Sequence, residues 1–252
     1  VEQEKEFRNK FPRNVQWAIE TAALWKELCP HIGLSIPLQA YTLEQAEEFC
    51  QRIRHVEFSA MSLPVRNMTL PVLARFMLKI HKWGVRQVHI LGSSSLPVIS
   101  VCAYMSQRFF DRVSFDATTW RIAAQFGRFI DPYELSSKKL NKPGSYNPHY
   151  RCHCAYCKGQ PLGKIAKMER KERMTLLMNH NHLAIHNLCR RFDKASFDYQ
   201  YLEGYLKNSK RKDVKKILQF MSEIETMCSP YTTRITGRKA SIEHSHGIRQ
   251  FI

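Results

Sequence analysis

The sequence predicts an α/β protein: part of a (β/α)8 TIM-type barrel with a parallel sheet, followed by a zinc-binding subdomain and C-terminal helices. Two observations support this prediction. Short apolar runs alternate with helical patterns at intervals of about 20 to 30 residues, which is the length of a βα unit. Beyond them, three cysteines fall within six residues, a density typical of a metal site rather than of a disulfide framework.

Each predicted element has its own signal in the chain. Four segments are predicted to be strands, because each is a short apolar run bounded by polar or turn-forming residues: 33–38, 56–59, 87–91 and 112–115. Thr42 and Gln45 form a capping box at the start of the first connecting helix. Gly84 ends a second helix over 69–83, and a third helix covers 97–108. Strands that alternate with helices in this way favour a parallel sheet.

The repeat fits two architectures, a doubly wound sheet and an eight-stranded barrel. No Gly-x-Gly-x-x-Gly follows the first strand, so a dinucleotide-binding sheet gains no support and the barrel is favoured. Four units supply only half of such a barrel. We therefore expect residues 1–148 to be the partial, C-terminal portion of a barrel, completed by a missing N-terminal portion or by a partner subunit.

Two further regions are expected after the barrel. A zinc-binding subdomain should cover 149–190, and a basic helical region should cover 191–252. The polar segment 138–148, with two prolines and a glycine, is predicted to be a loop that leads into the cysteines. Helical patterns cover 165–188 and 197–227.

The chain is strongly basic, with 39 Lys and Arg against 22 Asp and Glu among 252 residues, a formal net charge of +17. Residues 151–252 hold 20 of these cations and only 9 of the acids. Clustered cations bind polyanions, so we expect nucleic acid as a partner. The basic segment 207–213 is either a phosphate-contacting edge or a solvated turn.

Composition also limits the class of protein. A hydrophobic content of 44% excludes a disordered chain. No uncharged apolar run reaches the length of about 18 residues that a membrane span requires, so no membrane association is expected. The five cysteines outside the cluster are scattered, which indicates a reducing, cytoplasmic setting.

Cys152, Cys154 and Cys157 form a Cys-x-Cys-x-x-Cys motif. Three thiolates this close need a cation, and three sulfurs with one imidazole are a closed ligand set for zinc. The fourth ligand is expected from one of three histidines in the next helical segment: His180, His182 and His186. Spacing alone does not choose among them. Four protein ligands leave no position for water, so we expect one structural zinc per chain.

At these residues the chain resembles the tRNA-guanine transglycosylase superfamily, whose members are (β/α)8 barrels with a zinc subdomain near the C-terminus. The family's zinc motif is Cys-x-Cys-x-x-Cys, followed further along by a His-Asn pair. His180-Asn181, after a double leucine, looks most like the archaeal form of that pair, so the resemblance implies His180 as the fourth ligand. His186-Asn187 resembles the bacterial form and is the second choice.

The resemblance also implies a catalytic residue. The family's nucleophilic aspartate lies in a Phe-Asp pair that begins a strand, after a Leu-Gly turn and a helix. Here Phe110-Asp111 follows Leu91-Gly92, so Asp111 is the implied nucleophile and Asp116 its nearest competitor. The family's second aspartate, which handles protons on the base, lies in an Asp-Ser-Gly-Gly motif that this sequence does not contain.

Four residues match positions at which the family binds the base. Gln39 stands where the family has a base-binding glutamine, whose amide can donate to and accept from a purine edge. Ser62 and Leu63 align with a Gly-Gly-Leu-Ala-Val stretch whose backbone contacts the incoming 7-deazaguanine. Gly92 is the glycine of the Leu-Gly turn.

These resemblances imply a pentosyltransferase that exchanges a base in nucleic acid for a 7-deazaguanine, through a covalent aspartyl-glycosyl intermediate. Met61 and Ser62 replace two of the family's glycines, and this divergence favours the DNA-guanine transglycosylase branch, which exchanges guanine in DNA for a base such as preQ0. An enzyme acting on tRNA is the alternative. A third hypothesis is a non-catalytic, nucleic-acid-binding subunit of such an enzyme.

Overall fold

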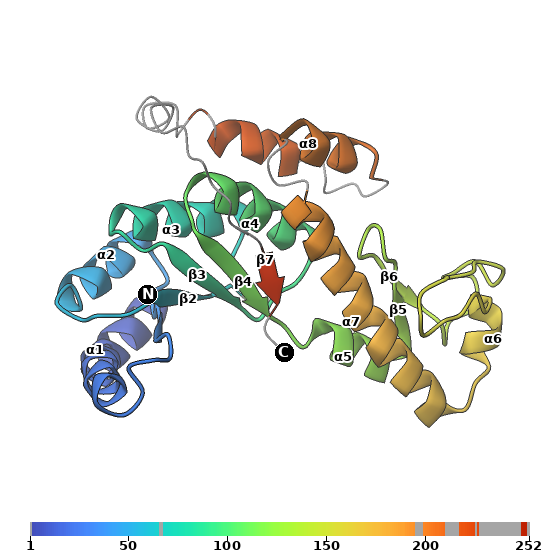
Figure 1. Ribbon diagram of the computed structural model, residues 1–252, viewed down its shortest axis with the longest axis horizontal. Helices are drawn as coiled ribbons and strands as arrows, with labels where there is room; N and C mark the ends of the chain where they lie inside the picture. Colours follow the sequence, from blue (N-terminus) through green and yellow to red (C-terminus); the bar gives the residue numbers. More distant parts are fainter. Residues whose placement is uncertain are drawn as a thin grey trace.

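The centre of the molecule is a parallel sheet. The computed structural model describes residues 2–65, 68–194, 199–209, 217–224, 226 and 248–250. The strand order is β1-β2-β3-β4-β7, and every neighbouring pair is parallel (Figure 1). The strands are β1 (Ser35–Pro37), β2 (Ala60–Pro64), β3 (Gln87–Leu91), β4 (Arg112–Asp116) and β7 (Ile248–Gln250). The predicted parallel α/β sheet is therefore confirmed, as an open sheet that does not close into a barrel within the described residues.

Three helices connect the strands and pack together on one face of the sheet (Figure 1): α2 (Leu43–Arg52), α3 (Leu70–Lys82) and α4 (Leu96–Arg108). The predicted boundaries hold. The Thr42 hydroxyl accepts a hydrogen bond from the Gln45 backbone N–H, and the Gln45 side chain accepts one from the Thr42 backbone N–H. Gly84 follows α3 with a φ of +85°, a conformation in which glycine avoids the strain of other residues.

The structure differs from the sequence predictions at several elements. The helical pattern over 165–188 is interrupted, because one helix ends at Ala166 and the next begins at Arg170. The second strand was predicted over 56–59, but the strand observed is β2, which follows that segment. The Val56 N–H donates to the Ile53 carbonyl, which keeps 56–59 in the turn after α2. The predicted loop at 138–148 begins inside a strand, β6 (Ser137–Lys139). Helix α1 (Glu2–Leu28) was not predicted, since its only buried residues, Phe7, Phe11 and Ala18, form a sparse stripe within a charged sequence.

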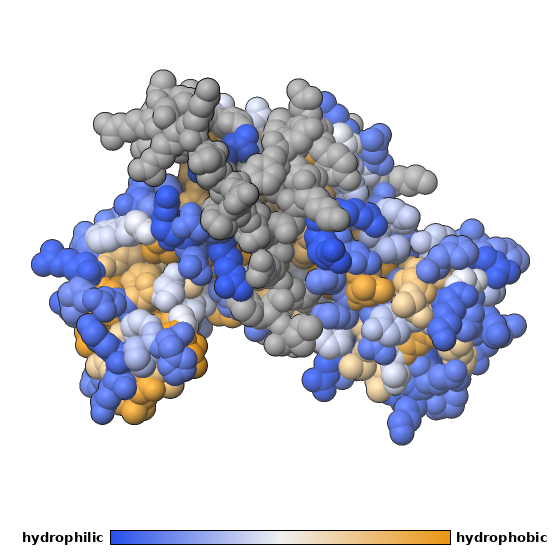
Figure 2. Space-filling model, viewed as in Figure 1, coloured by the Kyte–Doolittle hydropathy of each residue, from blue (hydrophilic) through white to orange (hydrophobic). Residues whose placement is uncertain are grey.

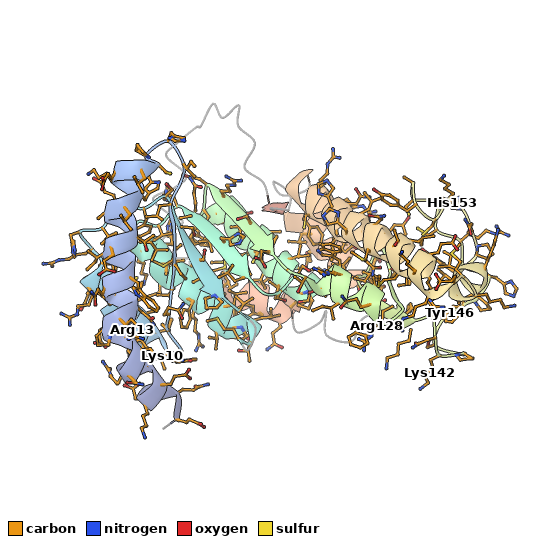
Figure 3. All side chains as sticks on the ribbon, turned by 90° about the horizontal axis from the view of Figure 1, so that it is seen from below. Lys10, Arg13, Arg128, Lys142, Tyr146 and His153 are labelled. Atoms are coloured by element: carbon orange, nitrogen blue, oxygen red, sulfur yellow. The ribbon has the colours of Figure 1, made fainter. Side chains whose placement is uncertain are left out.

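The two faces of the sheet differ in chemistry. One row from each strand is buried against the helices: Ile36, Met61, Leu63, Val88, Ile90, Val113 and Phe115. The opposite face, called the open face below, carries Ser62, His89 and Ser114 side by side on β2, β3 and β4. No helix in the described part of the chain lies across this face, which Figure 3 shows from below. Parallel sheets covered on both faces are apolar on both, so this sheet is helix-covered on one side only.

A second lobe, called the cysteine lobe, covers residues 119–181. It contains α5 (Thr119–Gln125), the antiparallel pair of β5 (Arg128–Ile130) and β6, helix α6 (Leu162–Ala166) and the first half of α7 (Arg170–Lys194). These elements share a separate apolar core with two of the cysteines. The lobe thus begins near α5, ahead of the boundary expected at residue 149. Its surface, at the right in Figure 2, is largely hydrophilic.

Helix α7 joins the two lobes. Leu177, in its first half, is buried in the cysteine lobe, whereas Ala184, Ile185 and Leu188 are buried in the main core, which lies between the sheet and its helices. Helix α8 (Tyr199–Lys207) and helical residues 217–224 follow. Most of the basic segment 207–213, from residue 210 on, lies outside the described residues. Among the helices that are described, none combines the length and the apolarity needed to cross a membrane.

Replacing Thr42 with alanine should lower the free energy of unfolding by about 0.5–2 kcal/mol, because the hydroxyl that caps α2 is lost. The matched control is Thr118→Ala, since Thr118 precedes α5 without any side-chain cap hydrogen bond. Urea unfolding of both variants measures the difference. Equal losses in the two variants would mean that the capping box does not stabilise α2.

Candidate metal centre and candidate active site

Four side chains of the cysteine lobe converge on one point. The ligand atoms of Cys152, Cys154, Cys157 and His180 all lie within 4.8 Å of one another. The Nδ1 atom of His180 lies 3.7, 3.3 and 3.5 Å from the three sulfurs in that order. Three of these residues are buried and Cys154 is half-buried. The structure therefore brings together the four residues that the sequence selected as a ligand set.

The three sulfurs are held by a tight turn of the backbone. The Cys157 N–H donates to the Cys154 sulfur at 3.4 Å, and the Lys158 N–H donates to the Cys154 carbonyl at 2.9 Å. The Gly159 N–H then donates to the Cys152 carbonyl at 3.0 Å. Lys158 and Gly159 both have positive φ, at 50° and 71°, which reverses the chain directly after the last cysteine. The turn thus aims all three sulfurs inward.

His180 reaches the sulfurs from α7 in a fixed orientation. Its Nε2 atom lies 2.9 Å from the Ile130 carbonyl on β5, and its ring stacks on Phe129 at a centroid distance of 4.1 Å. A carbonyl oxygen only accepts, so Nε2 donates and Nδ1 is the nitrogen left to bind a metal ion. Orientation of a ligand imidazole by a backbone carbonyl is the usual support of a protein metal site.

The geometry of the cluster fits a tetrahedral ion. Zinc at about 2.3 Å from sulfur and about 2.0–2.1 Å from nitrogen implies sulfur–nitrogen separations of about 3.5 Å. The three observed separations, from 3.3 to 3.7 Å, bracket that value. The cluster could therefore hold a metal ion such as zinc.

The sulfurs also control one another's protonation. The hydrogen bond with the Cys157 thiol, together with the contact with His180, lowers the pKa of Cys152 against the effect of burial, and the same bond raises the pKa of Cys157. Burial alone would lower the pKa of His180, but its contacts with the Cys152 and Cys154 sulfurs raise it to about 9. The cluster favours a thiolate at neutral pH, and all three sulfurs ionise together only when a cation neutralises them.

Asn181, next to His180, also binds the backbone of β5. Its side-chain oxygen accepts from the Ile130 N–H at 2.8 Å, and its side-chain nitrogen donates to the carbonyls of Arg128 at 3.0 Å and Trp120 at 3.2 Å. Asn181 is fully buried. Sequence reasoning used this residue only to recognise the His-Asn pair, and that pairing was the available signal for its role.

The other two candidate histidines lie outside the cluster. The ring of His182 packs edge-on against Trp120 at 5.3 Å, and the ring of His186 stacks on His182 at 6.4 Å. Both are half-buried. The helical period of α7 turns them away from the sulfurs, so only His180 contributes to the metal cluster.

The predicted active-site residues are spread over the sheet. Gln39 follows β1 and Gly92 follows β3, so both lie at the carboxyl edge. Asp111 precedes β4, at the amino edge, where it is exposed and 4.0 Å from Arg86. Asp116 ends β4, and its carbonyl accepts from the Gly92 N–H at 2.9 Å. Four strand residues lie between the two aspartates, so their Cα atoms are about 16 Å apart.

The remaining two predicted residues lie inside β2. The side chain of Leu63 is fully buried on the helix-covered face, so it belongs to the core. Ser62 points to the open face, where its hydroxyl lies 2.7 Å from that of Ser35. Of the predicted residues, Gly92 thus contacts the end of β4. Gln39 lies at the same edge of the sheet but at the end of β1, three strands from β4.

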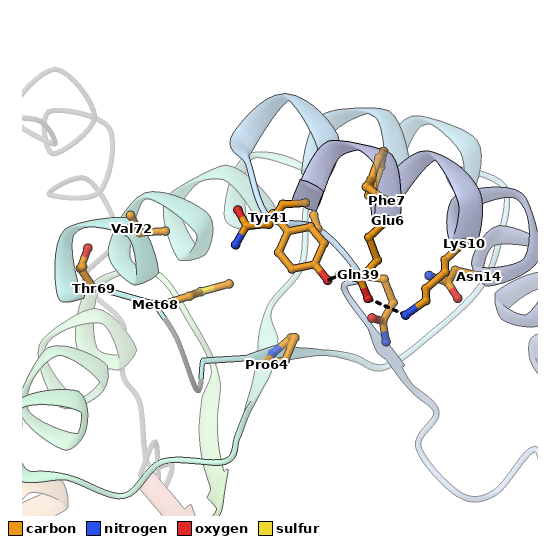
Figure 4. A pocket seen from close by; sticks show the side chains of 12 residues that line it. Glu6, Phe7, Lys10, Asn14, Gln39, Tyr41, Pro64, Met68, Thr69 and Val72 are labelled. Carbon is orange, nitrogen blue, oxygen red and sulfur yellow. Dashed lines mark hydrogen bonds and ion pairs between the residues drawn. The ribbon is translucent and has the colours of Figure 1, made fainter. Parts of the chain in front are cut away.

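A cavity of about 400 Å³ opens at the carboxyl ends of β1 and β2 (Figure 4). Its walls come from α1, the segment after β1 and the start of α3, and Gln39 is among the lining residues. On one wall, Glu6 accepts hydrogen bonds from Tyr41 at 2.9 Å and from Lys10 at 2.5 Å. Met68 and Val72 supply an apolar wall. The cavity therefore combines polar groups with a surface on which a flat ring can pack.

A scan against models of known protein families finds no match to this chain, and a search of curated proteins finds none either.

Metal analysis of the purified protein should find about one zinc per chain. His180→Ala should lose the metal, because Nδ1 of His180 faces all three sulfurs. His186→Ala is the matched control on the same helix and should keep it, since His186 packs on His182 instead. Full metal content in the His180 variant would remove that residue from the ligand set.

Asn181→Ala should keep a bound metal but weaken its affinity by about 10–100-fold, because β5 loses the hydrogen bonds that hold the acceptor of His180 in place. Asn179→Ala, at an exposed position of the same helix, is the control and should bind as the unaltered protein does. Competition with a chelator measures both affinities. An unchanged affinity for the Asn181 variant would separate the strand contacts from metal binding.

Proposed function

We propose that the chain acts in a base-exchange glycosyltransferase that replaces guanine in DNA with a 7-deazaguanine base. The observation that carries this proposal is the metal cluster. The Cys-x-Cys-x-x-Cys spacing selected Cys152, Cys154 and Cys157, and the resemblance to the tRNA-guanine transglycosylase superfamily selected His180 from three histidines. These four side chains converge. In this proposal the ion is one structural zinc, because four protein ligands leave no position for water.

The one-sided sheet supports a barrel as the complete architecture. In a (β/α)8 barrel, helices cover the outer face of every strand and the inner face lines the interior. Helices α2, α3 and α4 cover one face of the sheet, and Ser62, His89 and Ser114 lie on the other. We propose that the open face is the inner wall of such a barrel.

The position of Asp116 favours it over Asp111 as the nucleophile. Active sites of (β/α)8 barrels are built at the carboxyl ends of the strands, whereas residues at the amino ends contribute to stability. Asp116 ends β4, whereas Asp111 lies at the opposite edge and interacts with Arg86. Phe115-Asp116 is also a Phe-Asp pair, but it ends the strand, whereas Phe110-Asp111 precedes it as in the family's motif. The choice of Asp116 therefore rests on its position at the carboxyl edge.

The reaction would proceed by two displacements at the sugar. The Asp116 carboxylate attacks C1′ while the C1′–N9 bond breaks, and guanine leaves with the electron pair. N9 of the incoming base then attacks C1′ and releases the carboxylate, so the configuration is retained. The cavity beside Gln39, at about 400 Å³, lies within the range of about 300–1,000 Å³ found for small-molecule sites and is proposed to receive the base.

Charge on the cysteine lobe supports nucleic acid as the substrate. Residues 137–173 contain ten Lys and Arg but only two Asp and Glu. None of the ion pairs between described residues involves these cations. Cations without acidic partners bind phosphate and release its counterions. DNA is favoured by the divergence of β2 from the family's glycines, and tRNA is the alternative.

Asp116→Asn should abolish base exchange and the covalent protein–nucleic acid adduct, because an amide is a poor nucleophile. Asp111→Asn is the matched control and should remain active. The assay incubates the complete protein with labelled preQ0 and either duplex DNA or tRNA. Incorporation into tRNA alone would overturn the choice of DNA. Nucleic acid binding without any exchange or adduct would favour a non-catalytic binding subunit, and an active Asp116→Asn protein would dismiss Asp116.

A further inference from the structure

His89 occupies the centre of the open face. On β3 it pairs in register with Ser62 of β2 and Ser114 of β4, so it has a serine on each side. Its ring is half-buried, and its Nδ1 atom lies 2.9 Å from the Ser114 hydroxyl. A hydroxyl can both donate and accept, so Ser114 can hold the ring in the neutral and in the charged state.

Asp116 lies next to His89 on the same face. Ser114 and Asp116 are two residues apart on β4 and therefore point to one side, and Asp116 pairs in register with Leu91, two residues beyond His89. The carboxylate thus stands one step closer to the carboxyl edge than the imidazole. The pKa of His89 is lowered from its usual value, mainly by burial and also by Arg112 on β4, while the Asp116 carboxylate partly opposes the shift.

Few other groups on the described strands could carry a proton. The side chains of β1 to β4 include three ionisable groups: His89, Arg112 and Asp116. Arginine stays protonated in proteins, and Asp116 is proposed to attack the sugar. His89 is the one group left on these strands that can both donate and accept a proton near neutral pH.

We propose that His89 is the proton-transfer group of the exchange reaction, donating a proton to the departing guanine and taking one from the incoming base. This inference rests on the proposed function and extends it. Both tasks fall to a single residue because exchange consumes one proton in its first half and returns one in its second.

The steps balance. In the first half, Asp116 forms the bond to C1′, the electron pair of the C1′–N9 bond moves to guanine N9, and the His89 imidazolium gives the base its proton. In the second half, N9 of the incoming base loses its proton to the imidazole, bonds to C1′ and releases the Asp116 carboxylate. Carboxylate with imidazolium and ester with imidazole are both neutral pairs, so no net charge builds up in the site.

The test uses the leaving base. His89→Gln in the complete protein should reduce exchange of guanine by about 10²–10⁴-fold, the usual contribution of a general acid or base. Gln87→Ala, on the same strand and face, is the matched control and should leave the rate unchanged. N7-methylguanine carries a positive charge and leaves as a neutral base without a proton. Its release from DNA or tRNA by His89→Gln should therefore stay near the rate of the unaltered protein.

A second measurement separates proton transfer from a structural role. Added imidazole should restore guanine exchange to His89→Ala, because it supplies the missing group. Undiminished guanine exchange by His89→Gln overturns the inference and leaves the proposed function intact. Equal loss of guanine and N7-methylguanine release, with no rescue by imidazole, overturns it as well, since a misplaced nucleophile would slow both. Absence of any exchange by the unaltered protein on DNA and tRNA overturns the proposed function and this inference together.

Discussion

The cysteine lobe depends on the backbone of one residue of β5, Ile130. The Ile130 carbonyl orients His180, and the Ile130 N–H is held by Asn181, so two successive residues of α7 grip the same strand. These two hydrogen bonds fix the position of this part of α7 against β5. A ligand nitrogen tied in this way loses little freedom when a metal binds, which is the advantage of a preorganised site. Because α7 continues into the core between the sheet and its helices, it joins the metal cluster to the main lobe.

The sheet separates packing from chemistry. Its helix-covered face contains only buried apolar side chains. Its open face carries serines, a histidine and, at the carboxyl edge, an aspartate. Side chains alternate between the faces, so a shift of one residue in register would bury His89 and expose Val88. The parallel register between β3 and β4 is therefore what brings His89, Ser114 and Asp116 onto one surface.

Much of this could be predicted from the chain. Apolar runs at βα spacing predicted the parallel sheet, and strands β1, β3 and β4 and the connecting helices lie where the pattern put them. Strand β2 was misplaced because Val56 and Phe58 form an apolar run that packs without pairing. Helix α1 was missed because its local sequence is dominated by charged residues. Its few apolar residues are buried through contacts with distant ones, such as that between Phe11 and Phe49 on α2.

The sequence by itself determined which atoms are available: three thiols within six residues, a downstream His-Asn pair and two nearby aspartates. Only the tertiary structure decided how they are used. Three histidines on α7 lie at suitable distances along the chain from the cysteines. The contact of His180 with the Ile130 carbonyl orients that histidine, and not the other two, toward the sulfurs. Asp111 and Asp116 flank the same strand, and strand direction alone puts one at each edge of the sheet. Such choices depend on contacts between residues far apart in the chain, which local patterns do not encode.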